Sequence, residues 1–406
     1  MAVSMEPAES QLAVPAPVRW PERAACDLLR ALANPRVCAG AEPVAHAAEA
    51  ISDWDAACDL AREHGMLPAL YPGTAAIGSG PQAVPKLPQA VEHRLEREYQ
   101  GNVFHSVANA AEMIRILAAF GAQGIDAMPF KGVILAAAVY GDFTARAAGD
   151  LDILVHRRDL ERATALMLEA GYRLFTPVLD DGSPADPDHD EYHFEREADG
   201  MVVELRWRLQ MSQHTIRREL GLDWAGARRQ TIKVAGADMP AMNPETTLLV
   251  LAMHGCKHVW SRLMWIADIA RLIETNPDLD WDCTLREARR HGLTRALALA
   301  VLVAHHVAAA KPPSKVLAQF ERDRAMVRIA RHIEETLFAA PGSPPPGRIP
   351  YHLQLLARGD RARILFSREI LRPNERDLAA VKLPRPLRGL YPLVRVFRIL
   401  RDRSAR

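Results

Sequence analysis

The hydrophobic period of this chain changes twice, and the segment between the two changes is the feature that most constrains the fold. From about Ile125 to Val234, short runs of alternating apolar and polar residues replace the helical spacing that is found on either side. Two helical stretches interrupt these runs, one directly after Lys131 and one from near Arg157 to Gly171. This mixture of strands and helices, with helices before and after it, predicts an α+β domain between helical regions.

Changes in composition divide the chain into five parts. Residues 1–20 are rich in Ala, Pro and Glu, and we expect a loose tail there. We expect an N-terminal helical region over 21–120, the α+β domain over 121–242 and a second helical domain over 243–340. The Pro/Gly-rich run PGSPPPGRIP then opens residues 341–406, for which we predict a linker and a basic C-terminal helical segment.

Local signals place three of the expected elements. Helical spacing over residues 91–120 predicts one long helix that leads into the α+β domain. Alternating runs on both sides of Asp199-Gly200 predict a hairpin, because a tight turn of this type needs a positive φ. Asn243 followed by Pro244 predicts the start of a helix, with Asn as the cap and Pro at the first helical position.

Charge and composition exclude several classes of protein. The 51 Lys+Arg nearly cancel the 50 Asp+Glu, so the mean charge indicates no obligate polyanionic partner. The five cysteines are scattered without the Cys-x-x-Cys spacing of a zinc site. No uninterrupted apolar run approaches the roughly 18 to 20 residues of a membrane helix, and the start MAVSMEPAESQ lacks the pattern of a signal peptide. We therefore expect a cytoplasmic protein with no membrane span.

The C-terminal part is locally basic. From Tyr351 onward, 14 Lys/Arg face 5 Asp/Glu. The favoured interpretation is a solvated face on which long basic side chains cover apolar surface. The alternative is contact with phosphate or nucleic acid, which the sequence allows but does not favour.

The strongest chemical signal is the run GDLDILV at residues 149–155. On a strand, Asp150 and Asp152 project from one face while Leu151 and Ile153 point into the core. Two neighbouring carboxylates repel each other, which favours a raised pKa or a bound cation, and their oxygens are hard ligands suited to Mg²⁺ or Mn²⁺. The run predicts a divalent-metal site, although acids at a strand end also commonly face water.

Three further segments carry groups suited to the same site. Glu204 lies in the alternating run VVELRW, on a strand that can set it beside the aspartates. Lys131 and Gly132 lie where a short apolar run meets a helix, and an ammonium with helix N-terminal amides makes a phosphate seat. Arg146, four residues before Asp150, is suited to a second phosphate oxygen. Alone, Lys131 is equally an ordinary lysine near a helix start, but together these groups predict a metal and triphosphate site.

A later segment concentrates imidazole, indole and cationic side chains. We expect one helix that carries His254, Lys257, His258, Trp260, Arg262, Trp265 and Asp268. Helical spacing puts positions 254, 258, 262 and 265 near one face, so these side chains either line a cleft opposite the acidic residues or pack between helices. The two histidines have a zinc-like spacing, but no Glu follows the first, which excludes the metalloprotease motif.

Together these motifs resemble a known family. The run FKGVILAAAVYGDFTARAAGDLDILVHRRDLERATALMLEAGYRL, followed by VVELRW, is similar to the bacterial uncharacterised nucleotidyltransferase family of the DNA polymerase beta-like superfamily. The similarity continues through NPETTLLVLAMHGCKHVWSRLMWIADIARLI and into RPNERDLAAVKLPRPLRGLYPLVRVFRIL. It implies a small mixed-sheet nucleotidyltransferase domain in the α+β segment.

The resemblance implies roles for the residues that match. Asp150 and Asp152 would bind the metals, and Glu204 would complete the acidic triad and align or deprotonate the incoming hydroxyl. The resemblance also favours a cleft-facing position for His254 and Lys257.

Two positions depart from the family pattern. Lys131 and Gly132 match the nucleotide-phosphate turn, but the wider superfamily has Gly-Ser or Gly-Gly there, and Val133 offers no hydroxyl. Lys131 is therefore expected to substitute for that group. Arg206 stands where the family commonly has His after the third acid.

The implied activity is transfer of a nucleoside monophosphate from a nucleoside triphosphate to a hydroxyl, or an amine, with release of pyrophosphate. Mg²⁺ or Mn²⁺ is the implied cofactor. The alternative is a non-catalytic nucleotidyltransferase-like binding protein in a peptide-biosynthesis or toxin–antitoxin system. No motif specifies the acceptor or the nucleotide.

Overall fold

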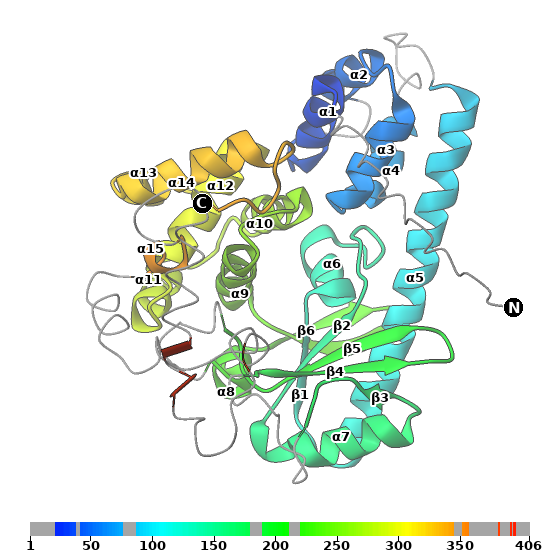
Figure 1. The fold of residues 1–406 in the computed structure, drawn as a ribbon, viewed down its shortest axis with the longest axis vertical. Coiled ribbons are helices and arrows are strands. Elements are labelled where there is room, and N and C mark those ends of the chain that lie inside the picture. Colours follow the sequence, from blue (N-terminus) through cyan, green and yellow to red (C-terminus); the bar gives the residue numbers. More distant parts are fainter. Residues whose placement is uncertain are drawn as a thin grey trace, which may run out of the picture.

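The computed structural model describes residues 21–37, 41–75, 87–178, 189–210, 220–344 and 351–356, with a few positions after residue 380. The expected loose tail over 1–20 and most of the basic C-terminal segment lie outside this described part. Figure 1 shows the helices and strands along the chain. In chain order the elements are α1 (Arg23–Ala33), α2 (Glu42–Glu49), α3 (Trp54–Glu63), α4 (Leu67–Ala75), α5 (Gln89–Ala122), β1 (Ala127–Phe130), α6 (Gly132–Tyr140), β2 (Leu151–Val155), the 3-10 helix η1 (Arg157–Asp159), α7 (Leu160–Glu169), β3 (Arg173–Leu174), β4 (Glu191–Arg196), β5 (Met201–Arg206), α8 (Leu222–Gly226), β6 (Gln230–Val234), β7 (Ala237–Ala241), α9 (Pro244–Lys257), α10 (Leu263–Thr275), α11 (Trp281–Arg290), α12 (Thr294–Ala308), α13 (Ser314–Glu321), α14 (Arg324–Thr336) and α15 (Tyr351–Gln354).

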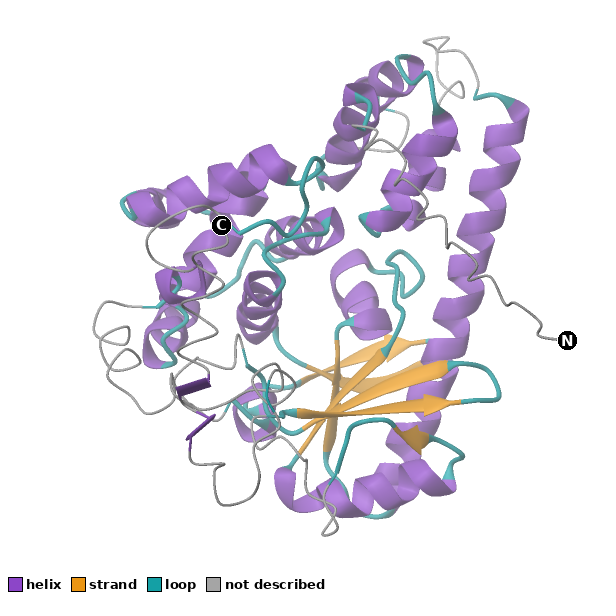
Figure 2. Ribbon diagram, viewed as in Figure 1, coloured by secondary structure: helices purple, strands orange, loops and turns teal. Residues whose placement is uncertain are grey.

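A five-stranded mixed sheet forms the centre of the α+β segment, as the sequence predicted. Its strand order is β1-β2-β5-β4-β3, with β2 and β5 parallel and the other neighbours antiparallel. The sheet lies toward one end of the molecule, and most of the remaining elements are helices (Figure 2). The predicted fold class, α+β with flanking helical regions, is confirmed.

The alternation along β2 and β5 separates an apolar face of the sheet from a polar one. Leu151, Ile153, Val203 and Leu205 are at most 1% exposed and pack in one cluster with residues of α5 and α7. Parallel pairing sets Asp152 directly opposite Glu204. Both carboxylates therefore project from the face that α5 and α7 do not cover.

The predicted hairpin is formed by β4 and β5. Its last pair is Arg196 with Met201, so four residues form the loop, and Gly200 at its end has the positive φ (+70°) that the motif predicted. The alternating residues at the end of the α+β segment form β6, which pairs with β7 in a separate two-stranded sheet.

The long helix α5 runs along one side of the molecule (Figure 1). It continues two residues past the expected end at Phe120, and Gly124, with φ +66°, follows in the turn after it. An 18-residue window of α5 has a mean hydropathy of 1.2, so by length and composition alone the helix is apolar enough to cross a membrane. In the structure it packs on the sheet, and its buried Glu112 accepts hydrogen bonds from Tyr172 (2.6 Å) and Arg196 (2.8 Å). One such helix is weak evidence for a span, because a core helix passes the same test.

The expected single helix from His254 to Asp268 was wrong: a turn separates α9 from α10. Val259 (φ +51°) and Trp260 (φ +52°) take left-handed backbone conformations, which a continuing helix cannot contain. The indole of Trp260 is 1% exposed and lies on Gly255, where a Cβ atom would be 2.5 Å from the ring. The buried indole thus fixes the turn, and Gly255 leaves the space for it.

We predict opposite effects for two helical Gly→Ala substitutions. In Gly255→Ala the added methyl overlaps the buried Trp260 ring, and overpacking of this kind costs about 1–3 kcal/mol of unfolding free energy. In the control Gly101→Ala, on α5, the methyl meets no atom within 4 Å, so better helix propensity should stabilise by up to about 1 kcal/mol. Urea denaturation measures both values. Equal effects of the two substitutions would show that Trp260 does not hold the turn.

Candidate active site

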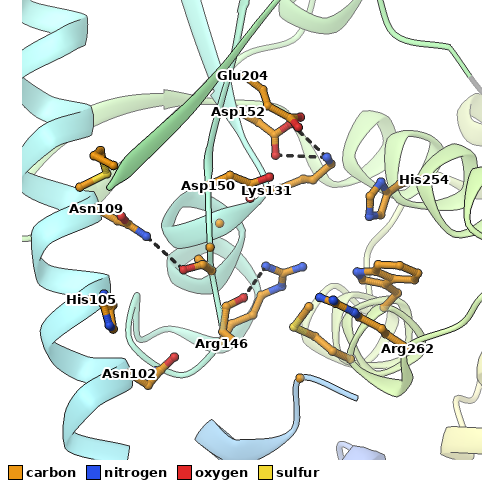
Figure 3. A pocket seen from close by; sticks show the side chains of 18 of the residues that line it. Asn102, His105, Asn109, Lys131, Arg146, Asp150, Asp152, Glu204, His254 and Arg262 are labelled. Atoms are coloured by element: carbon orange, nitrogen blue, oxygen red, sulfur yellow. Dashed lines mark hydrogen bonds and ion pairs between the residues drawn. The ribbon is translucent and has the colours of Figure 1, made fainter. Parts of the chain in front are cut away.

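A cavity of about 1030 Å³ lies between the polar face of the sheet, α5 and the turn between α9 and α10. Figure 3 shows part of its lining, with the acidic residues on one side and His254 and Arg262 on another. Every residue predicted for the site lines this cavity: Lys131, Gly132, Arg146, Asp150, Asp152, Glu204, His254, Lys257, His258 and Arg262. The structure therefore brings together groups that are up to 131 positions apart in the sequence.

The acidic triad is assembled by the two parallel strands. Asp150 directly precedes β2, Asp152 lies on β2, and Glu204 lies opposite it on β5. Each residue offers a carboxylate oxygen, and these three oxygens lie within 4.8 Å of one another. Three hard oxygen donors from three side chains at this spacing fit a divalent cation such as Mg²⁺ or Mn²⁺.

Two cations balance part of the negative charge of the triad. The Lys131 ammonium donates to both oxygens of Asp152 at 3.1 Å (Figure 3). The Arg206 guanidinium donates to Asp152 at 3.2 Å and also contacts Glu204 and Glu191. Asp152 is only 2% exposed, so its charge needs such partners. Arg206, which departs from the family pattern, thus holds two acids of the triad in place.

The three acids differ in pKa. Burial, followed by the nearby charges of Asp152 and Glu204, raises the pKa of Asp150 to about 6. Burial also raises the pKa of Glu204 above its ordinary value, against the opposing effect of Arg206. Burial opposes ionisation of Asp152 too, but Lys131 and Arg206 lower the pKa of its carboxyl below the usual value. One acid is therefore firmly ionised, and two take up protons more readily than an exposed carboxylate.

The Lys131-Gly132 turn places a helix N-terminus at the cavity. Lys131 caps α6 with φ +59°, and Gly132 follows with φ +46°. Two successive residues in the left-handed region allow β1 to turn sharply into α6 beside Asp150, whose carbonyl oxygen is 3.5 Å from the position of a Cβ on Gly132. The first backbone amides of α6 have no partner within the helix, which suits them to a phosphate.

Arg146 lines the cavity and is paired with the buried Asp268. Its Nε donates to both carboxylate oxygens of Asp268 at 3.0 Å, and the Tyr140 hydroxyl donates to the same carboxylate at 2.9 Å. Arg146 is 6% exposed and Asp268 is fully buried. This buried network ties the segment before β2 and the end of α6 to α10, and so fixes the second helical region against the sheet.

The sequence analysis missed a group of residues on α5. Asn102 donates to the carbonyl of Thr144 at 2.7 Å, and Asn109 donates to the carbonyl of Ala148 at 3.2 Å (Figure 3). Both asparagines thereby hold the segment that leads to Asp150. The available signal was their spacing: seven positions are two helical turns, which puts both amides on one side of α5.

Aromatic rings surround His254 at the other wall. The ring centroids of His254 and His258 are 4.8 Å apart, and each imidazole also contacts the indole of Trp265, at 4.8 and 5.3 Å. Burial and then the charge of Lys131 hold the pKa of His254 well below its ordinary value. The His254 imidazole is therefore neutral at pH 7. It lines the cavity from α9, as the resemblance implied.

Comparison with known protein families supports the resemblance. Residues 51–309 match the family model described as "Uncharacterised nucleotidyltransferase", which covers more than half of the chain. No curated protein matches the sequence. The matched segment runs from the end of α2 past the end of α12 and contains every residue predicted for the site.

Metal affinity should depend on pH because protons and metal compete for the same carboxylates. Asp150, with a pKa of about 6, must lose its proton to bind a cation. We expect the affinity for Mn²⁺ to fall about tenfold between pH 7 and pH 5 and to level off above about pH 7. Calorimetric titration between pH 5 and pH 8 measures this, and Asp150→Asn should bind more weakly with a shallower pH profile. Equal affinity of the wild type at pH 5 and pH 7 would contradict the assignment.

Removing the partner of buried Arg146 should strongly destabilise the fold. Asp268→Asn leaves an unpaired buried charge, which costs about 3–5 kcal/mol of unfolding free energy. The matched control is Asp238→Asn, whose pair with Lys233 is 64–72% exposed and contributes less than about 1 kcal/mol. Chemical denaturation compares the two variants, and a loss no larger than the control's would show that the network is not structural.

Proposed function

We propose that this chain, which belongs to the uncharacterised nucleotidyltransferase family, transfers a nucleoside monophosphate from a nucleoside triphosphate to a hydroxyl, or an amine, of an acceptor. The observation that carries the proposal is the acidic triad: Asp150, Asp152 and Glu204 present oxygens within 4.8 Å of one another in a large cavity. In the described part of the chain, no other group of three metal-ligating side chains has this geometry.

The donor set suits a divalent cation. Three carboxylates supply only oxygen, the donor that Mg²⁺ and Mn²⁺ prefer, and no cysteine lines the cavity among the described residues. Asp150, Asp152 and Glu204 would hold the ion or ions. When bound, such ions offset the negative charge that develops on the attacking and leaving oxygens.

The chain's cations are placed to bind a triphosphate. The Lys131 ammonium lies 3.1 Å from Asp152 and lines the cavity. We therefore assign it a phosphate oxygen of a nucleotide bound beside the triad. The amides that begin α6 at Gly132 provide uncharged donors for a second oxygen. Arg146 adds positive charge to the wall, but its Nε is bound to Asp268, so we assign Lys131 the larger share of phosphate binding.

We assign to Glu204 the acceptance of a proton from the acceptor. Its raised pKa makes it the stronger base relative to Asp152, and Arg206 keeps it oriented beside that residue. In the reaction the acceptor oxygen forms a bond to the α-phosphorus, and the bond from that phosphorus to the bridging oxygen breaks. Pyrophosphate leaves with the bonding electron pair, and Glu204 takes the proton of the hydroxyl.

Loss of a triad carboxylate should abolish transfer. With each α-³²P-labelled nucleoside triphosphate, Mg²⁺ and a cell extract, the wild type is expected to label itself or an acceptor. Asp152→Asn and Glu204→Gln should each lower that rate by at least about 100-fold, since each removes a group that holds charge in the transition state. Asp238→Asn, on the surface, should leave the rate unchanged.

A binding experiment separates this proposal from the non-catalytic alternative. Because Lys131 and Arg206 already balance much of the charge of the triad, the acidic strand is also compatible with a protein that only binds. Calorimetry with Mg²⁺ and ATP distinguishes the two. If the wild type binds no nucleotide in the presence of Mg²⁺, and Asp150→Ala with Asp152→Ala changes nothing, the result would favour a non-catalytic binding protein in a peptide-biosynthesis or toxin–antitoxin system.

A further inference from the structure

The cations that line the cavity fall into two groups. Among the described Lys and Arg residues of its wall, most have a carboxylate within 4.0 Å: these are Arg62, Lys131, Arg146 and Arg206. Lys257 and Arg262 also line the cavity, and no described carboxylate lies within that distance of either. Both belong to the segment that joins α9 to α10. The unbalanced positive charge of the cavity is thus concentrated at one place, which we name the α9–α10 turn (residues 257–262).

This turn is held rigidly. His64 is fully buried, and its Nδ1 accepts a hydrogen bond from the Leu263 amide (3.2 Å). The backbone carbonyl of His64 accepts a second one from the Met264 amide (3.1 Å). Trp260 is anchored on the other side by its packing against Gly255. Val259 and Trp260 take a left-handed backbone although neither is glycine, so the packing around them must hold this conformation in place. The backbone that carries the two cations is therefore preorganised.

His258 lies in the same turn and offers an uncharged donor beside the two cations. Partial burial, followed by the charge of Lys257, brings the pKa of His258 to about 4. The imidazole is therefore neutral at pH 7 and can donate one hydrogen bond beside the two cations. An anion at this position would meet two charges and a neutral donor.

The groups proposed to bind the nucleotide phosphates, Lys131 and the start of α6, belong to other elements than the turn. The cavity, at about 1030 Å³, is at the upper end of the range of about 300–1000 Å³ for single-ligand sites, so a second molecule has room. We propose that the α9–α10 turn binds a carboxylate or phosphate group of the acceptor through Lys257 and Arg262. This inference rests on the proposed function, because it identifies the second substrate of that reaction.

The charges of the remaining wall favour a compact anion over a polyanion. Glu191 and Asp199 also line the cavity, and a long phosphate backbone would have to pass them. The acceptor thus carries a reactive hydroxyl or amine near Glu204 and one oxyanion on the far side of the cavity.

The test is calorimetric titration of the full chain with inorganic phosphate and, separately, with acetate, each in the presence of Mg²⁺ and α,β-methylene-ATP. We expect at least one anion to bind the wild type and its affinity to fall about tenfold or more in Lys257→Gln with Arg262→Gln. The preferred probe identifies the phosphate or the carboxylate as the recognised group. The affinity for the nucleotide analogue should change by less than about twofold.

A second double variant controls for general electrostatics. Lys233→Gln with Arg173→Gln removes the same charge from exposed positions and should not alter anion binding. Thermal melting of both double variants checks that each is folded.

Three results would overturn the inference: no binding of either anion to the wild type, equal anion binding by the turn variant, or a loss of nucleotide affinity as large as the loss of anion affinity. The last result would mean that the turn holds the nucleotide's own phosphates. If the wild type fails to bind the analogue, the proposed function fails, and titration of both anions without nucleotide still decides whether the turn is an anion site.

Discussion

The parallel pairing of β2 with β5 is the constraint on which the site depends. It sets Asp152 opposite Glu204, while the antiparallel neighbours β1 and β4 complete the sheet on either side. A slip of one residue in this pairing would turn Glu204 toward the apolar cluster under α5 and α7 and bring Val203 or Leu205 to the cavity. The apolar side chains that alternate with the acids oppose that slip, so the core of the domain also secures the geometry of its carboxylates.

Bringing carboxylates together in a buried site costs folding free energy, and buried cations offset part of that cost. Lys131 and Arg206 stabilise the ionised form of Asp152, while Asp150, farther from these partners, has a raised pKa. A protein that used these acids only for folding would gain from complete pairing. The incomplete compensation at Asp150 leaves a demand for positive charge that a divalent cation can meet.

A second set of buried charges couples the sheet to the helices. Arg146 and Asp268 lie 122 positions apart, and their contact joins the segment before the triad to α10. The Asn109 amide holds the same segment from α5. The acidic triad and the α9–α10 turn are thus fixed to one another through well-bonded side chains, which gives the cavity a defined shape.

The sequence predicted those parts of the site that depend on local alternation. Asp150, Asp152 and Glu204 each alternate with apolar residues, so their common exposure to one side followed from a period of two. The break between α9 and α10 could not be predicted this way, because it depends on how the Trp260 ring packs on Gly255. The pairing of Arg146 with Asp268 could not be predicted either, because no local sequence pattern indicates which distant acid an arginine will contact. β3, with two residues, is too short to leave a periodic signal.

The most direct test of the account is anomalous diffraction from crystals grown with Mn²⁺ and a non-hydrolysable nucleoside triphosphate analogue. The account predicts an anomalous peak ligated by oxygens of Asp150, Asp152 and Glu204, with the phosphates of the analogue beside Lys131. Bound nucleotide with Mn²⁺ located away from these three carboxylates, or triad oxygens that remain paired only with Lys131 and Arg206, would contradict it.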